Sequence, residues 1–262
     1  SDLTAYVAHR LAQGAAAASV NHELATIRRA FRLAVRGGEL VNMPHVPMLT
    51  LNNARQGFFE RHEFEAVLTH LPAYLHAPLT FAFVTGWRLK SEVLPLTVDR
   101  VDLQAGVVRL DTGTTKNNEG RSFYVTAELR DVLTAQLDSI EALKEQGTIC
   151  PYLFHRPDGT RIKDFRKTWA NACEAAGHPG KLFHDFRRSA VRTLERSGVP
   201  RSTAMAMVGH KTESIYRRYA IVDEQMHREA AAKLDTWNIE QQAKAEAERK
   251  GQVQRFKKRQ AR

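Results

Sequence analysis

The sequence is poor in cysteine: Cys150 and Cys173 are the only two among its 262 residues. Two thiols alone can build neither a disulfide framework nor a four-thiolate zinc site. No apolar run approaches the roughly 18 residues that a membrane-spanning helix needs. We therefore expect a chain that does not cross a bilayer and that works in a reducing, cytoplasmic compartment.

Several common signatures of enzyme chemistry are also missing. The sequence contains no P-loop, no GxGxxG dinucleotide fingerprint and no HExxH metalloprotease motif. Its eleven histidines are scattered, and none pairs with a cysteine at metal-ligand spacing. No group of carboxylates has the spacing of a two-metal nuclease. The sequence thus predicts no metal site and no cofactor.

Basic residues are abundant. The chain carries 39 Lys and Arg against 29 Asp and Glu, a formal net charge of +10. Such an excess favours a polyanionic partner, most often nucleic acid, with an anionic membrane as the alternative. The composition, with 43% hydrophobic and 26% charged residues, is that of a globular chain rather than a disordered one. Because the chain begins at Ser1, we expect it to be a fragment of a longer protein.

The first fifty residues have the pattern of a helical domain. Four apolar side chains recur at helical spacing, namely Leu24, Ile27, Phe31 and Val35. Asn21 is the candidate cap of this helix, and Gly37 and Gly38 end it. Four arginines surround the same helix and are candidate DNA-binding residues: Arg28, Arg29, Arg32 and Arg36. The proline-bearing stretch 43–56 is the candidate linker.

The rest of the chain is predicted to be mainly helical with one small antiparallel sheet. Helices are expected at about 127–145, 163–176, 185–197 and 200–208, the last opened by Pro200 at its first position. The β-rich runs 107–110 and 122–125 predict two strands around a loop at 112–120. The fold class is therefore α+β, mainly α. We expect a truncated helical domain at 1–50, a larger domain at 57–222 and a helical, basic tail at 223–262.

Three short segments carry polar residues that suit phosphate chemistry. His184 and Arg187 stand three apart in the first turn of a predicted helix, where both side chains and free backbone N–H groups can bind an anion. Arg88 follows a Thr-Gly turn after an apolar helix, and Lys116 lies at the predicted hairpin loop. His210 follows a glycine and precedes Tyr219 by nine residues. Taken singly, each has an ordinary structural explanation, such as a solvated arginine or a packed tyrosine.

Taken in order, these segments resemble the catalytic domain of the tyrosine recombinases, the phage integrase family. The shared order is an arginine after a Thr-Gly turn, a hairpin lysine, HxxR, and Gly-His nine residues before a tyrosine, over roughly residues 58–222. The resemblance implies six catalytic residues: Arg88, Lys116, His184, Arg187, His210 and Tyr219. It also implies that residues 1–50 are the end of a DNA-binding domain, and that double-stranded DNA and three further copies of the chain are the partners.

Three positions depart from the family pattern or compete with it. The acidic residue expected three positions after Arg88 is Ser91 here, and Glu92 stands one position later, which leaves the role of Glu92 open. Arg188 occupies a position where many members carry a second histidine. Tyr216 is a rival nucleophile, but the spacing from His210 favours Tyr219.

The resemblance implies a site-specific recombinase or integrase that works through a 3′-phosphotyrosyl intermediate, without metal or ATP. In that chemistry Arg88 and Arg187 clamp the phosphate, His184 and His210 donate hydrogen bonds, and Lys116 protonates the leaving 5′-oxygen. His184 is also the candidate acceptor of the tyrosine proton. Two alternatives remain: a related type IB topoisomerase or telomere resolvase, and a non-catalytic regulator that uses residues 185–215 as a helix-turn-helix.

Overall fold

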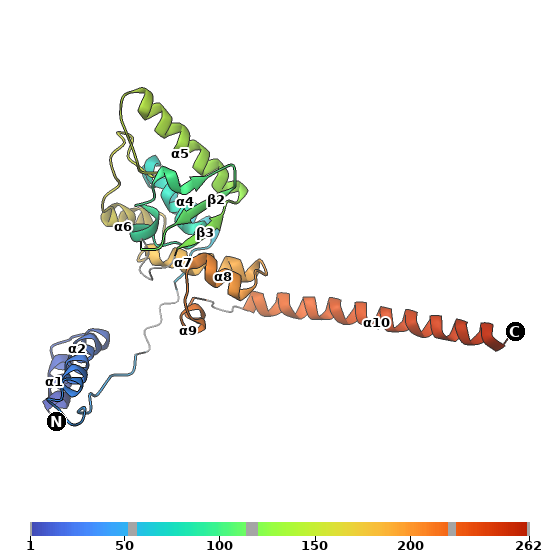
Figure 1. Cartoon of the computed structure of the whole chain (residues 1–262), viewed down its shortest axis with the longest axis horizontal. Coiled ribbons are helices and arrows are strands. Elements are labelled where there is room, and N and C mark those ends of the chain that lie inside the picture. Colours follow the sequence, from blue (N-terminus) through green and yellow to red (C-terminus); the bar gives the residue numbers. More distant parts are fainter. Residues whose placement is uncertain (1, 52–56, 114–119, 220–223, 261–262) are drawn as a thin grey trace. The chain divides into compact units, whose positions relative to one another are not determined.

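The computed structural model describes residues 2–51, 57–113, 120–219 and 224–260 (Figure 1). The chain divides into two compact units, Ser1–Gln56 and Gly57–Arg262. Among the described residues, no helix is long and apolar enough to span a membrane. Lys116 lies outside the described residues.

The first unit is a pair of helices, α1 (Asp2–Ala12) and α2 (Ala17–Arg36). Its small core contains Val7, Val20 and Leu24 together with Val46 from the following segment. Helix α2 ends at Arg36 with Gly37 as its C-cap, as predicted.

The prediction that Asn21 caps this helix is wrong. Asn21 lies inside α2, and its side-chain amide donates to the Leu49 carbonyl and accepts from the Leu49 N–H, both at 2.8 Å. Part of the predicted linker is therefore tied to the first unit.

The second unit combines helices with one small sheet (Figure 1). Its elements are α3 (Arg61–Leu68), α4 (His76–Thr85), β1 (Val101–Asp102), β2 (Val107–Leu110), β3 (Arg121–Tyr124), α5 (Ala127–Glu145), α6 (Arg166–Ala175), α7 (Phe183–Arg196), α8 (Arg201–Val208), α9 (Glu213–Arg217) and α10 (Glu224–Gln260), with short helical turns η1 (Ala73–Leu75), η2 (Leu89–Val93) and η3 (Val98–Arg100). The mainly helical α+β class is confirmed.

The sheet is antiparallel with strand order β1-β2-β3. Val108 pairs with Phe123 at its centre, and both side chains face the core. The two predicted strands are present as β2 and β3, with β3 one residue earlier than expected. The short β1 was not predicted, because two residues are too few to show an alternating pattern.

Helix α7 passes through the core of the second unit. Its Phe186 contacts the rings of Phe64, Phe83 and Trp169 at centroid distances of 5.4 to 6.0 Å. The helix begins two residues earlier than predicted because Asp185 accepts the Leu182 N–H at 2.8 Å, which satisfies a free donor of its first turn.

Two other helix starts also differ from the prediction. Helix α6 begins at Arg166, three residues late, where Asp164 accepts the Arg166 N–H. Pro200 is the N-cap of α8 and not its first helical residue.

Candidate active site

The turn after α4 is pressed against α7. Gly86 has φ +66°, and a Cβ there would lie 2.8 Å from the Ala190 Cβ on α7. Glycine therefore serves both the left-handed backbone and the close approach of the two helices. As a result, the Gly86 carbonyl reaches Arg187, and Arg88 emerges beside the first turn of α7.

Arg187 is buried and held at all three of its guanidinium nitrogens. Nη1 donates to the Gly86 carbonyl at 2.9 Å, Nη2 to the Gly209 carbonyl at 3.2 Å, and Nε to His210 Nε2 at 2.8 Å. Burial, followed by the nearby charge of Arg88, lowers the pKa of Arg187 to about 10. The side chain is therefore still cationic at neutral pH, and its orientation is set before any ligand arrives.

His210 serves as an acceptor in this network. Because its Nε2 accepts from Arg187, the neutral ring carries its proton on Nδ1. Burial is the main cause that lowers the pKa of His210 to about 3, with the charges of Arg187 and Arg88 adding to the effect. The ring is neutral at physiological pH, and of its two nitrogens only Nδ1 can donate a hydrogen bond to a ligand.

Tyr219 lies between the two histidines. Its hydroxyl is 2.7 Å from His184 Nε2, and its ring stacks on His210 at a centroid distance of 4.7 Å. Burial, then Arg187 and Arg188, lowers the pKa of His184. A neutral His184 can accept a hydrogen bond from the Tyr219 hydroxyl at Nε2.

Tyr216 is in a different environment. It is fully buried in a small cluster with Val191, Ala204 and Val208. Burial raises the pKa of its phenol. The geometry thus brings Tyr219, and not Tyr216, to His184.

A π-helical turn accounts for the departure at Ser91. In η2 the Val93 N–H donates to the Arg88 carbonyl at 3.1 Å, and the Leu94 N–H donates to the Leu89 carbonyl at 2.9 Å, five residues back in each case. In an ordinary capping box the third residue after the cap reaches back to the cap N–H. The π-helical turn is one residue wider, so here the side chain of the fourth residue, Glu92, accepts a hydrogen bond from the Arg88 N–H.

Glu92 is the residue that the wide turn carries inward. Its carboxylate is fully buried, accepting from the Arg88 N–H at 2.6 Å and from Arg88 Nη1 at 2.5 Å. The acidic partner of Arg88 is therefore present despite its shifted position.

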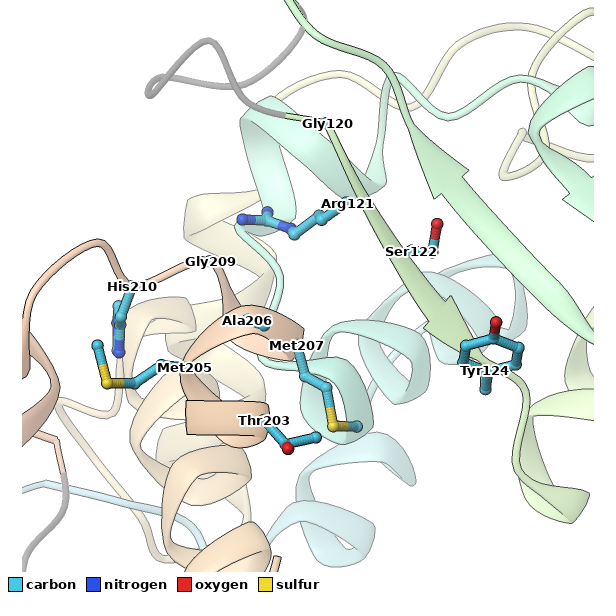
Figure 2. A pocket seen from close by; sticks show the side chains of 10 residues that line it. All are labelled: Gly120, Arg121, Ser122, Tyr124, Thr203, Met205, Ala206, Met207, Gly209 and His210. Carbon is cyan, nitrogen blue, oxygen red and sulfur yellow. The ribbon is translucent and has the colours of Figure 1, made fainter. Parts of the chain in front are cut away.

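Two of the cavities among the described residues adjoin the arginines and histidines of this cluster. The smaller, about 260 Å³, is lined by Arg88, Lys90, His184 and Arg187 and can accept an anion. The larger, about 540 Å³, lies between β3 and α8 (Figure 2). Figure 2 shows Arg121 from β3 and His210, beyond the end of α8, on its border.

Arg121 is a residue of this region that sequence reasoning missed. Its guanidinium forms an ion pair with Glu92 and lies 5.1 Å from the centre of the Trp87 ring. The side chain is only 8% exposed. A basic residue between the predicted loop at 112–120 and the predicted strand at 122–125 carried no signal of burial.

The remaining sequence-derived candidates lie elsewhere or outside the described residues. Arg29, Arg32 and Arg36 are exposed on α2 of the first unit, and Arg28 is half-buried there. The five described catalytic candidates of the second unit, in contrast, form one cluster: Arg88, His184, Arg187, His210 and Tyr219. No group of three or more His, Cys, Asp or Glu able to hold a metal ion occurs in the described part of the chain.

Residues 58–226 match the model of the phage integrase family. No curated protein matches the sequence.

Solved structures with the same fold include the Tn1549 transposon integrase in complex with circular intermediate DNA (TM-score 0.68, 14% identity, 88% of this chain and 83% of that one). A lambda integrase dimer bound to a COC′ core site has a TM-score of 0.65 at 15% identity, with 84% and 78% covered. The XerH recombinase bound to a palindromic difH substrate has a TM-score of 0.61 at 18% identity, with 88% and 69% covered.

Proposed function

Since the chain belongs to the phage integrase family of tyrosine recombinases, which cleave and rejoin DNA, we propose that it is a site-specific recombinase acting through a 3′-phosphotyrosyl intermediate. The observation that carries this proposal is the 2.7 Å contact between the Tyr219 hydroxyl and His184 Nε2, next to two arginines. The reaction needs neither a metal ion nor ATP, because side-chain cations compensate the phosphate charge and the covalent link conserves the energy of the broken bond.

The cleavage step assigns one task to each side chain. Tyr219 Oη attacks phosphorus, and its proton passes to His184 Nε2. Arg88 and Arg187 stabilise the extra negative charge on the non-bridging oxygens. The bond from phosphorus to the 5′-oxygen breaks, and Lys116 protonates that oxygen. Attack by a 5′-hydroxyl from another strand reverses these steps and joins a new partner.

A nicked suicide duplex in EDTA tests this proposal. When the nick lies next to the cleavage site, the short 5′-hydroxyl fragment diffuses away and the covalent adduct accumulates. We expect the adduct to form at the same rate with EDTA as with Mg²⁺. A strict requirement for a divalent ion in the cleavage step would contradict the mechanism. Relaxation of supercoils without products that join paired sites would favour the topoisomerase alternative.

The protonation of His184 predicts an acid limb in the rate of cleavage. His184 accepts the phenol proton only when neutral, and its pKa is lowered by burial and by two arginines. The single-turnover rate, followed between about pH 5 and 8, should therefore remain high at the ordinary histidine pKa and fall only at lower pH. His184→Gln keeps a hydrogen-bonding side chain but does not titrate, so this variant should be slow and lack the acid limb. A wild-type rate that falls already above pH 6.5 would contradict the role of His184.

The role of Lys116 can be tested through the leaving group. Lys116→Ala should be slow on ordinary DNA and recover on DNA with sulfur at the 5′-bridging position, because a thiolate leaves without protonation. Arg88→Ala should not recover on the same substrate, since its defect concerns the non-bridging oxygens. If Lys116→Ala remained slow on the sulfur substrate, Lys116 would not be the acid.

The exposed arginines of α2 are the proposed DNA-backbone contacts of the first unit. Neutralising Arg29, Arg32 and Arg36 would then weaken binding to all sequences alike and flatten its salt dependence.

The helix α10 is the proposed contact between copies of the chain in a tetramer on two DNA sites. Trp237 and Ile239 are 57% and 66% exposed, and burying each fully would contribute about 1.5–3 kcal/mol. Truncation after Asp235 should spare binding to one site but weaken two-site complexes in native gels. Removing only residues 255–262 is the matched control and should leave both complexes intact. Unchanged two-site complexes after the longer truncation would place α10 outside the assembly interface.

A further inference from the structure

Arg121 connects segments that are far apart in the sequence. It is the first residue of β3 and stands five positions after Lys116 in the sequence. Its guanidinium forms the ion pair with Glu92, and its Nη1 lies 3.4 Å from the Val208 carbonyl, at the end of α8. One buried side chain therefore contacts both the turn that presents Arg88 and the turn that presents His210.

The turn before His210 is built around this arginine. Gly209 has φ +72°, and a Cβ there would overlap the Arg121 guanidinium. The Gly209 carbonyl on the same turn accepts from Arg187 Nη2. The Arg121 guanidinium thus fills the space beside Gly209. It packs against the same backbone turn whose carbonyl orients Arg187.

The charges around Glu92 give Arg121 a second task. Arg88 and Glu92 alone would form a neutral pair, with the carboxylate drawing the guanidinium away from a phosphate. Arg121 adds a second cation to the same buried carboxylate. The group then has a net charge of +1, and Arg88, whose side chain is 26% exposed, is its solvent-accessible member.

We propose that Arg121 is a positioning residue for phosphate cleavage: it neutralises Glu92 so that Arg88 keeps its charge for the scissile phosphate, and it supports the turn of Gly209 and His210. This inference rests on the proposed function, because it assigns Arg88 to the phosphate. Arg121 itself does not touch the reacting atoms.

The test measures single-turnover adduct formation with Arg121→Met, which keeps much of the side-chain volume but removes its charge and donors. We expect cleavage to slow about 10²-fold, the low end of what the loss of one preorganised donor costs, while the Kd for DNA changes less than about threefold. Arg109→Met is the matched control. Arg109 lies on the neighbouring strand β2, is 53% exposed and pairs with Asp102 at 3.7 Å, so its loss should leave the rate unchanged.

A double-mutant cycle tests whether Arg121 acts through the charge of Glu92. In a Glu92→Gln background there is no carboxylate charge to neutralise, so Arg121→Met should slow cleavage less than about tenfold further. An equal effect in both backgrounds would show that Arg121 does not act through the charge of Glu92, and would overturn that part of the inference. Arg121→Lys, which keeps the charge, should recover part of the rate and stands in if the methionine variant fails to fold.

The outcomes also separate this inference from the proposed function. If the wild-type protein forms no adduct, the proposed function is wrong and the inference fails with it. If the wild-type protein and Arg121→Met form the adduct at similar rates, only the inference is wrong.

Discussion

Tyr219→Phe is expected to abolish the covalent adduct and leave DNA binding unchanged. The substitution removes only the nucleophilic oxygen and keeps a ring of nearly the same size stacked on His210. Adduct formation on a nicked suicide duplex, followed by denaturing gel, should fall below detection, while gel shifts report the same Kd as wild type. No other group in the proposed mechanism can form the bond to phosphorus.

Tyr216→Phe is the matched control for this result. Tyr216 is fully buried, and burial raises the pKa of its hydroxyl, so it does not meet the phosphate in our mechanism. This variant should form the adduct at a rate close to wild type. If Tyr219→Phe formed the adduct and Tyr216→Phe did not, the nucleophile would be Tyr216 and not Tyr219.

Arg187→Lys is expected to have the second largest effect. Lysine keeps the positive charge but loses the planar group that donates at once to the Gly86 and Gly209 carbonyls and to His210. The loss of one preorganised donor at the phosphate should slow single-turnover cleavage about 10²–10³-fold. The buried acceptors left without a donor should also lower the free energy of unfolding by about 1–3 kcal/mol, which denaturant unfolding of the free protein measures.

The control for this substitution is Arg166→Lys. Arg166 lies at the start of α6, is 73% exposed and pairs with Asp164. Its replacement should change neither the cleavage rate nor the stability. A cleavage rate near wild type in Arg187→Lys would remove Arg187 from the phosphate clamp.

Much of the fold follows from local patterns in the sequence. The helix predicted at about 127–145 is present as α5, because its apolar spacing is regular; in the structure Thr126 caps it. Asn21 shows the limit of such reasoning. Asparagine is a common cap, but here its amide pairs with the backbone of Leu49, 28 residues away, which no local pattern can reveal.

In the candidate site, too, local sequence patterns predicted some features, and contacts between distant residues remained unpredicted. Motif order predicted the side chains that gather around Tyr219, whereas the catalytic roles of those side chains remain predictions. The role of Glu92 stayed open in the sequence, which gave no sign of the π-helical turn that brings this side chain to Arg88. Arg121 was missed because its partners, Glu92 and Val208, are distant in sequence.

The most direct test of the central claim is to identify the residue that carries the DNA. The wild-type protein is incubated with a nicked suicide duplex in EDTA, the adduct is digested with protease and nuclease, and the modified peptide is sequenced by tandem mass spectrometry. Our account predicts a nucleotide joined through a 3′-phosphate to Tyr219. A nucleotide on Tyr216, attachment through a 5′-phosphate, or an adduct that forms only when Mg²⁺ is restored would contradict it.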